Sequence, residues 1–279
     1  MRIGFHISIA GGFPLAIDRA AFVGCTTMQI FSHSPRMWKV SDIKPDEAAA
    51  FIAARKKAGI TPLFVHTSYL INLAAADSEL HAKSIAALRN EMERAEILGA
   101  EFVVTHLGSA SGSPEQEAME RVADGLGRAL EGFTGNARLL IENTSGERGD
   151  VGCRFGDIAW IIKSSGLQNL GVTVDTCHSF GAGYDIKTKK GLDAAVRLMD
   201  ETFGLSRLKL IHLNDSKHPL ASLRDRHEDI GKGFIGEDGF RLILNHPKLK
   251  AVPMVMETPK STPDDDIRNL AVAMRLREG

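Results

Sequence analysis

Nine side chains in the sequence could bind metal ions. Most of them stand at the end of a short apolar segment. They are His66, His106, Glu142, Asp175, His178, His212, Asp225, His227 and Glu257. Imidazole nitrogens and carboxylate oxygens suit zinc and also manganese or iron, and the set contains no thiolate. A catalytic zinc takes three protein ligands and a water. Nine ligands therefore predict about three ions, with some carboxylates bridging.

Two local pairs in this set have informative spacing. Asp175 and His178 lie three residues apart in VDTCH, where a strand is expected to turn into a loop. Asp225 and His227 are expected in a long extended loop, where alternate residues point to the same side. Cys177 is expected to face away from Asp175 and His178 and to pack.

The charge of such a cluster indicates its substrate. Three divalent ions would outweigh four carboxylates and one hydroxide, which leaves a positive site that favours an anion. Clustered ions that activate water and hold both the attacking and the leaving oxygen are suited to phosphoester cleavage.

The elements that must position these residues are eight short segments rich in Ile, Val, Leu and Phe. They cover 2–8, 28–32, 63–67, 102–106, 139–143, 171–176, 208–213 and 253–258. Their composition is typical of strands buried on both faces. They recur about every 35 residues, which is the length that a strand and its returning helix need.

Helical patterns lie between the predicted strands. They cover 45–58, 78–98, 154–163, 189–203 and 263–277. Pro45 at the start of one and Gly59 after its end are helix boundary signals. Alternating strands and helices indicate a parallel α/β sheet, and eight units predict a single-domain (β/α)8 TIM barrel over 1–279. A doubly wound open sheet is the alternative, but no GxGxxG follows the first strand.

Composition excludes several classes of protein. The chain has 279 residues with 34 Lys and Arg and 35 Asp and Glu, so its net charge of −1 excludes binding of nucleic acid by bulk charge. No apolar run is long enough to span a membrane, and no signal segment opens the sequence. Three widely spaced cysteines predict no disulfide framework, so we expect a reducing, cytoplasmic location.

Longer motifs carry a resemblance to a known family. They are GFHISIAGG (4–12), HTSYLINLA (66–74), THLGS (105–109), IENTSG (141–146), VTVDTCHSFGAGYD (172–185), IHLNDSK (211–217), DRHEDIGKGFIG (225–236) and METP (256–259). Together they resemble the endonuclease IV family of apurinic/apyrimidinic (AP) endonucleases. The resemblance runs from one end of the chain to the other and implies a TIM barrel with a trinuclear metal site.

The resemblance also implies a ligand assignment. The first ion would take His66, His106 and Glu142; the second would share Glu142 and take Asp175, His212 and Glu257; the third would take His178, Asp225 and His227. The implied cofactor is Zn²⁺, about three per chain, with Mn²⁺ an alternative at one site. Glu142 would orient the attacking water and help to deprotonate it.

The implied substrate is duplex DNA that contains an abasic site or a blocked 3′ end. Hydrolysis 5′ to the lesion would leave a 3′-hydroxyl and a 5′-deoxyribose phosphate, and the enzyme would also trim blocked 3′ ends. Arg36 matches an inserting residue of the family, Tyr69 a stacking aromatic, and Arg226 is placed to meet a phosphate. The neighbours of Arg36 depart from the amide-rich form of this loop. A monomer is expected, because duplex DNA must reach the barrel rim.

Two other functions compete with this interpretation. Glu142, Asp175, His212 and Glu257 resemble the metal site of xylose-isomerase-like sugar isomerases and epimerases, which have no evident use for the other five ligands. A metal-dependent DNA-binding or scaffold protein would tolerate loss of the Glu142 carboxylate. His6 points from the first strand toward the rim, where it either donates to a ligand carboxylate or has no such role.

Overall fold

Eight parallel strands form the centre of the molecule. The computed structural model describes residues 1–262 and 264–278. The strands are β1 (Ile3–Phe5), β2 (Met28–Phe31), β3 (Leu63–His66), β4 (Phe102–Thr105), β5 (Arg138–Glu142), β6 (Gly171–Asp175), β7 (Leu208–His212) and β10 (Met254–Met256). They are hydrogen-bonded in the order β1-β10-β7-β6-β5-β4-β3-β2. A parallel bridge between His6 and Gln29 joins the two end strands, so the sheet closes into the predicted TIM barrel.

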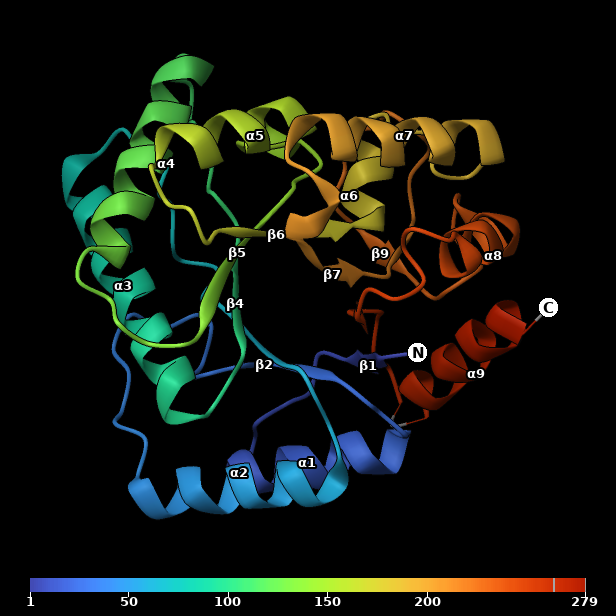
Figure 1. Ribbon diagram of the computed structural model, residues 1–279, viewed down its shortest axis with the longest axis horizontal. Helices are drawn as coiled ribbons and strands as arrows, with labels where there is room; N and C mark the ends of the chain where they lie inside the picture. Colours follow the sequence, from blue (N-terminus) through green and yellow to red (C-terminus); the bar gives the residue numbers. More distant parts are fainter. Residues whose placement is uncertain (263, 279) are drawn as a thin grey trace.

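Helices surround the strands on all sides (Figure 1). They are α1 (Phe13–Val23), α2 (Pro45–Ala58), α3 (Ser78–Ile97), α4 (Glu115–Leu130), α5 (Phe155–Ser164), α7 (Lys189–Thr202), α8 (Gly236–Asn245) and α9 (Asp265–Glu278). The five predicted helices are confirmed to within two residues at each end, except that Pro263 lies outside the described residues. None of the described helices is long and apolar enough to cross a membrane.

Smaller elements follow the strands at the end of the barrel where the strands terminate. They are the short helices α6 (Thr176–Gly181) and η1 (Glu147–Gly149) and the two-stranded antiparallel ribbon of β8 (Asp215–Ser216) and β9 (His227–Glu228); a further turn, η2 (Leu205–Arg207), leads into β7. The prediction of a loop after Asp175 is thus wrong, because Asp175 caps the helix α6. Its Oδ1 accepts the backbone N–H of His178 at 2.8 Å.

The barrel interior is a small apolar layer, separate from the larger core between the strands and the helices. It consists of Phe64, Val104, Leu140, Leu210 and Val255, all fully buried. Side chains alternate between the two faces of a strand, so the residue two positions further along points to the same side. In all five strands that residue is a predicted ligand. The list is His66, His106, Glu142, His212 and Glu257. Strand register therefore places five ligands on top of the interior layer, at the mouth of the barrel.

Candidate metal centre

The predicted ligands meet in three groups at the barrel mouth. In each group the candidate ligand atoms lie within 4.8 Å of one another, and the groups are His66, His106 and Glu142; Glu142, Asp175 and His212; and His178, Asp225 and His227. The ninth predicted ligand joins the second group, because Glu257 Oε2 lies 3.6 Å from His212 Nδ1. Glu142 belongs to two groups, which is the arrangement that a bridging carboxylate needs.

Three histidines are oriented by backbone carbonyls. The Nδ1 atoms of His66, His178 and His227 lie 2.8, 2.9 and 3.1 Å from the carbonyl oxygens of Thr67, Asn143 and Glu257, respectively. A carbonyl can only accept, so each Nδ1 carries the proton and each Nε2 offers a lone pair. Every free Nε2 points toward a carboxylate of the cluster. This is the usual way in which a protein fixes the tautomer of a metal-binding histidine.

His212 is oriented the other way round. Its Nε2 lies 2.9 Å from the side-chain oxygen of Gln29, and its Nδ1 lies 2.8 Å from Glu142 Oε1. Nδ1 is therefore the atom that it offers to a metal ion. Gln29 was not predicted as a site residue, although it is fully buried in β2 and directly contacts two of the predicted ligands.

Glu142 occupies the centre of the cluster. Its Oε2 lies 3.4 Å from His66 Nε2 and 3.6 Å from His106 Nε2, and the residue is fully buried. Burial alone would raise the pKa of this carboxyl, but the surrounding histidines, His212 and His106 foremost, lower it well below its usual value. Glu142 is therefore an anion at neutral pH.

The imidazoles show the reciprocal effect. Burial alone would lower the pKa of His212, but Glu142 and Glu257 raise it to about 9. The pKa of His227 likewise rises to about 9, because Asp175 and Asp225 overcome the effect of burial. Without a metal ion, these imidazoles take up protons to balance the carboxylates. A divalent cation supplies the same positive charge and displaces those protons.

The donor set fits a divalent metal ion. Among residues 1–262 and 264–278, the buried atoms Glu142 Oε2 and His227 Nε2 have no hydrogen-bond partner. Buried polar atoms are rarely left without a partner, and both of these belong to the predicted ligand groups. A divalent ion bound by imidazole nitrogens and carboxylate oxygens satisfies them.

Cys177 does not face away from the ligands as the sequence predicted. Its Sγ lies within 4.8 Å of ligand atoms of Asp175 and His227, because the helical turn that follows Asp175 rotates the side chain toward the ribbon. Burial raises the pKa of this thiol to about 12, and the Sγ contacts the carbonyl of Arg226 at 3.6 Å. The protonated thiol is a packing residue, as predicted.

A cavity of about 700 Å³ opens over the cluster. Its floor includes His66, His106, His178, Asp225, His227 and Glu257. Its walls come from the end of β2 and the loops after β1, β2 and β3, and they include Ile7, Phe31 and Tyr69. The cavity thus gives a small polar substrate group access to the candidate ligands.

Comparison with known proteins identifies the family. A family model described as a xylose isomerase-like TIM barrel matches residues 17–276. A probable endonuclease 4 from Methanoculleus marisnigri is 44% identical over 276 residues, which cover 98% of each chain. The crystal structure of endonuclease IV from Thermus thermophilus covers 100% of this chain and 99% of its own, with a TM-score of 0.90 and 39% identity. The chain belongs to the endonuclease IV family.

The rival isomerase class shares the barrel fold with this endonuclease IV family member. A D-tagatose 3-epimerase-like protein matches 100% of this chain and 97% of its own with a TM-score of 0.73, but with 19% identity. Identity at this level shows a common barrel and carries no argument about the chemistry.

Two of the three predicted DNA-contacting residues lie near the cavity. Tyr69 lines it with 63% of its surface exposed, and its ring meets Phe31 edge-on with the ring centroids 5.2 Å apart. Arg226 lies beside Asp225 but is paired with Glu147, whose Oε2 is 3.3 Å from Arg226 Nη1. Arg36 is exposed on the loop after β2 and is not among the residues that line the cavity.

Two asparagines that support ligands were missed by the sequence analysis. Asn214 Nδ2 donates to Asp175 Oδ2 at 2.6 Å, and its Oδ1 accepts the backbone N–H of Glu257 at 2.7 Å. Asn143 Oδ1 accepts the backbone N–H of Asp175 at 2.8 Å. Each asparagine follows the end of a strand by one or two residues, in IEN and HLN. This position beside the candidate ligands is the sequence feature that could have identified them.

The loops after β2 and β3 are held by a buried pair on α3 that was also missed. Glu91 accepts from Ser32 Oγ at 2.6 Å and from the backbone N–H of Ser68 at 3.1 Å, and it contacts His33 Nε2 at 3.0 Å. Arg94, three residues further along, donates to the carbonyls of Ser32 and Ser41. These contacts fix the loops that carry Arg36 and Tyr69.

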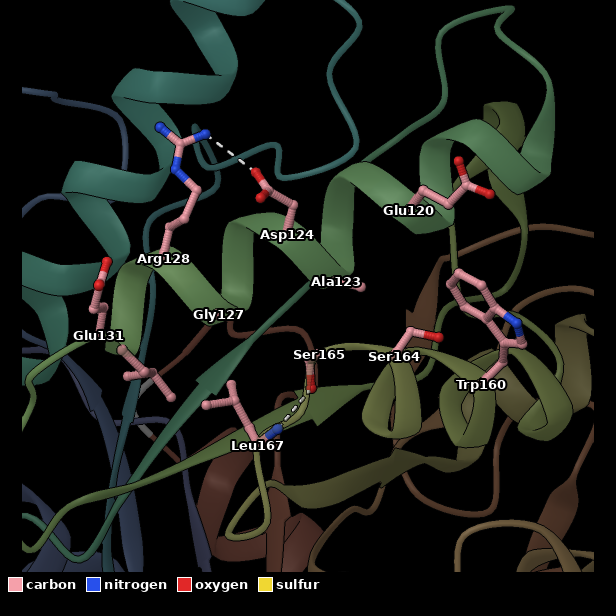
Figure 2. A pocket seen from close by; sticks show the side chains of 11 residues that line it. Glu120, Ala123, Asp124, Gly127, Arg128, Glu131, Trp160, Ser164, Ser165 and Leu167 are labelled. Atoms are coloured by element: carbon pink, nitrogen blue, oxygen red, sulfur yellow. Dashed lines mark hydrogen bonds and ion pairs between the residues drawn. The ribbon is translucent and has the colours of Figure 1, made fainter.

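A second hollow, of about 650 Å³, lies between α4 and α5 (Figure 2). Its lining contains none of the predicted site residues. Arg128 pairs there with Asp124 at 3.1 Å, and both side chains are more than half exposed. This is an ordinary solvated face between two helices.

Proposed function

We propose that this protein is a metal-dependent DNA repair phosphodiesterase, a hydrolase of the deoxyribonuclease IV type. It cleaves the phosphodiester bond 5′ to an abasic site in duplex DNA, leaves a 3′-hydroxyl and a 5′-deoxyribose phosphate, and trims blocked 3′ ends. One observation carries this proposal: the nine candidate ligands converge in three neighbouring groups, two of which share Glu142. A sugar isomerase needs only the group on β5, β6, β7 and β10.

The proposed ligand sets follow the three groups. His66, His106 and Glu142 would hold the first ion; Glu142, Asp175, His212 and Glu257 the second; and His178, Asp225 and His227 the third. We propose Zn²⁺, about three per chain, with Mn²⁺ an alternative at one of these sites. Divalent ions bound here supply Lewis acidity, which acidifies water and offsets the charge of a phosphate.

The proposed role of Glu142 follows from its ionisation and its central position in the cluster. Its neighbours keep the carboxylate charged, and Oε2 has no hydrogen-bond partner among the described residues. The charged carboxylate at the centre of the cluster therefore orients the attacking water and helps to deprotonate it. The oxygen that attacks the phosphorus becomes part of the 5′-phosphate, and the departing 3′ oxygen takes up a proton.

The cavity supports an extrahelical abasic nucleotide as the substrate. A base-free deoxyribose phosphate leaves the duplex at less cost than a paired nucleotide, because no base pair is broken. The cavity has apolar walls such as Ile7 and Phe31 for the sugar and the ligand cluster for the phosphate. Tyr69 at its entrance offers a ring face for stacking, while Arg36 and Arg226 meet the DNA backbone and grooves.

We further propose that the protein, as one domain over 1–279, acts as a monomer in the cytoplasm. The rim must be open to admit a duplex, which favours a single copy. All three cysteines, Cys25, Cys153 and Cys177, are free, which suits a reducing compartment.

Incision of a defined duplex tests the proposal. The substrate carries one tetrahydrofuran analogue of an abasic site, which blocks β-elimination so that only hydrolysis can cut it. The assay contains EDTA in place of magnesium, and bound metal is counted by emission spectroscopy. We expect a cut 5′ to the analogue with a 3′-hydroxyl end and about three zinc or manganese ions per chain.

Two variants complete the test. Glu142→Gln should abolish incision, whereas Glu79→Gln, an exposed change on α3, should not. No incision by the wild-type protein, together with only one or two ions per chain, would overturn the proposal in favour of ketose and aldose substrates.

A further inference from the structure

We propose that Gln29 is a positioning residue of the metal centre, whose carboxamide fixes both the ring of His212 and the carboxylate of Glu257. The inference rests on the proposed function, since it concerns the ion that these two ligands would share with Glu142 and Asp175. It assigns a role to a strand residue that is not itself a ligand.

The contacts of Gln29 are short and leave one arrangement of its amide. Nε2 lies 2.7 Å from Glu257 Oε1, and Oε1 lies 2.9 Å from His212 Nε2. A carboxylate only accepts hydrogen bonds, so the NH₂ group must face Glu257 and the carbonyl must face His212. His212 Nε2 must then carry the proton, which leaves the Nδ1 lone pair directed at Glu142.

This dependence sets His212 apart from the histidines oriented by backbone carbonyls. His66, His178 and His227 keep their tautomer as long as the chain keeps its path. The tautomer of His212 depends on one side chain, which can be replaced without altering the backbone. A change at residue 29 should therefore affect one ion of the cluster and spare the other two.

Gln29 is itself held in place. It is fully buried, its backbone carbonyl accepts the N–H of Ile7 at 2.8 Å, and its Nε2 also contacts His6 Nδ1 at 3.0 Å. Both hydrogens of the NH₂ group thus have acceptors, one on Glu257 and one on His6. A side chain with every polar atom engaged cannot rotate without breaking contact with a ligand.

Metal affinity of two apolar variants tests the role. Gln29→Met keeps the length of the side chain and Gln29→Leu keeps its bulk, and both remove the hydrogen bonds to Glu257, His212 and His6. Thr27→Val is the matched control, because Thr27 is also fully buried, directly before β2, but donates to the carbonyl of Pro62, away from the ligands. Zinc-loaded proteins are dialysed against graded chelator, and the metal that remains is counted per chain.

We expect both Gln29 variants to bind one ion about 10- to 100-fold more weakly and to retain the others, as is typical when an outer partner of a ligand is lost. Thr27→Val should match the wild type. The cobalt-loaded variants should also show an altered visible spectrum, which a loss of packing alone would not produce.

The outcomes separate this inference from the proposed function. If both folded variants release all ions at the wild-type chelator concentrations, Gln29 only fills space and the inference is wrong. If either variant fails to fold, the other decides. If the wild-type protein itself binds no cluster of ions, the proposed metal centre fails, and the inference fails with it for a distinguishable reason.

Discussion

The metal centre and the loop rim that surrounds it are built on different principles. In the centre, five candidate ligands stand two residues beyond the apolar layer of the barrel interior, so strand register brings them to the barrel mouth. In the rim, Arg36, Tyr69 and Arg226 sit on loops, and all three side chains are exposed. The comparison teaches that regular local structure brings five candidate ligands to the barrel mouth, whereas the rim is placed by contacts between distant parts of the chain.

The anchoring of the rim shows what those distant contacts are. Glu91 and Arg94 lie on α3, yet they bind residues of the loops after β2 and β3. The two loops are also joined directly, because Ser68 Oγ donates to the carbonyl of Pro35 at 2.7 Å. Arg36 and Tyr69 should therefore move as one unit.

The largest expected effect comes from a change in the centre. Asp175→Asn keeps the shape of a fully buried ligand but removes its charge. We expect kcat to fall by about 10²- to 10⁴-fold, because the second ion is weakened together with the groups it activates. Asp124→Asn, an exposed change on α4, is the control. Single-turnover incision with metal counting checks this, and wild-type rates with a full complement of ions would contradict it.

Metal removal should also lower stability. A ligand that binds only the folded state stabilises it by about 2.7 kcal/mol at a hundredfold excess over its Kd. Chelation should therefore lower the Tm by several degrees, and added zinc should restore it. Calorimetry with and without chelator measures the shift. An unchanged Tm would show that the cluster does not bind ions tightly.

A change in the anchor should affect the rim and spare the centre. Glu91→Gln removes the charge that three partners share, and we expect KM for abasic DNA to rise by about 10-fold, in line with the loss of about 1–3 kcal/mol at a buried hydrogen-bonded group. The kcat and the metal content should stay close to wild type. Glu93→Gln, an exposed change on the same helix, is the control. A fall in kcat with unchanged KM would mean that the two regions are not separable.

The smallest expected effect concerns Arg36. Replacing it with Ala should weaken DNA binding by a few fold and reduce the slope of log K against log salt by about 1, if its guanidinium meets one phosphate. Titration of a fluorescent abasic duplex at several salt concentrations measures both. An unchanged slope with weaker binding would instead indicate a contact with bases or sugars.

The strand positions and the meeting of the candidate ligands at the barrel mouth could be predicted, because both follow from local patterns. Each predicted strand is an apolar run, and the ligands follow it at fixed spacing, as with Leu140 and Glu142. The capping of α6 by Asp175, the contact of Cys177 with the cluster and the role of Gln29 could not be predicted. They depend on how separate elements meet. The ion pair of Arg226 with Glu147 was missed for the same reason.

The seam of the barrel has a consequence for when the candidate metal centre can form. Gln29 and Glu257 are 228 residues apart in sequence, and they touch where the first strands meet the last. A chain still emerging from the ribosome lacks β10 and cannot complete the mouth. The group of candidate ligands that includes Glu257 is therefore assembled only after the last strand has been synthesised and has closed the barrel.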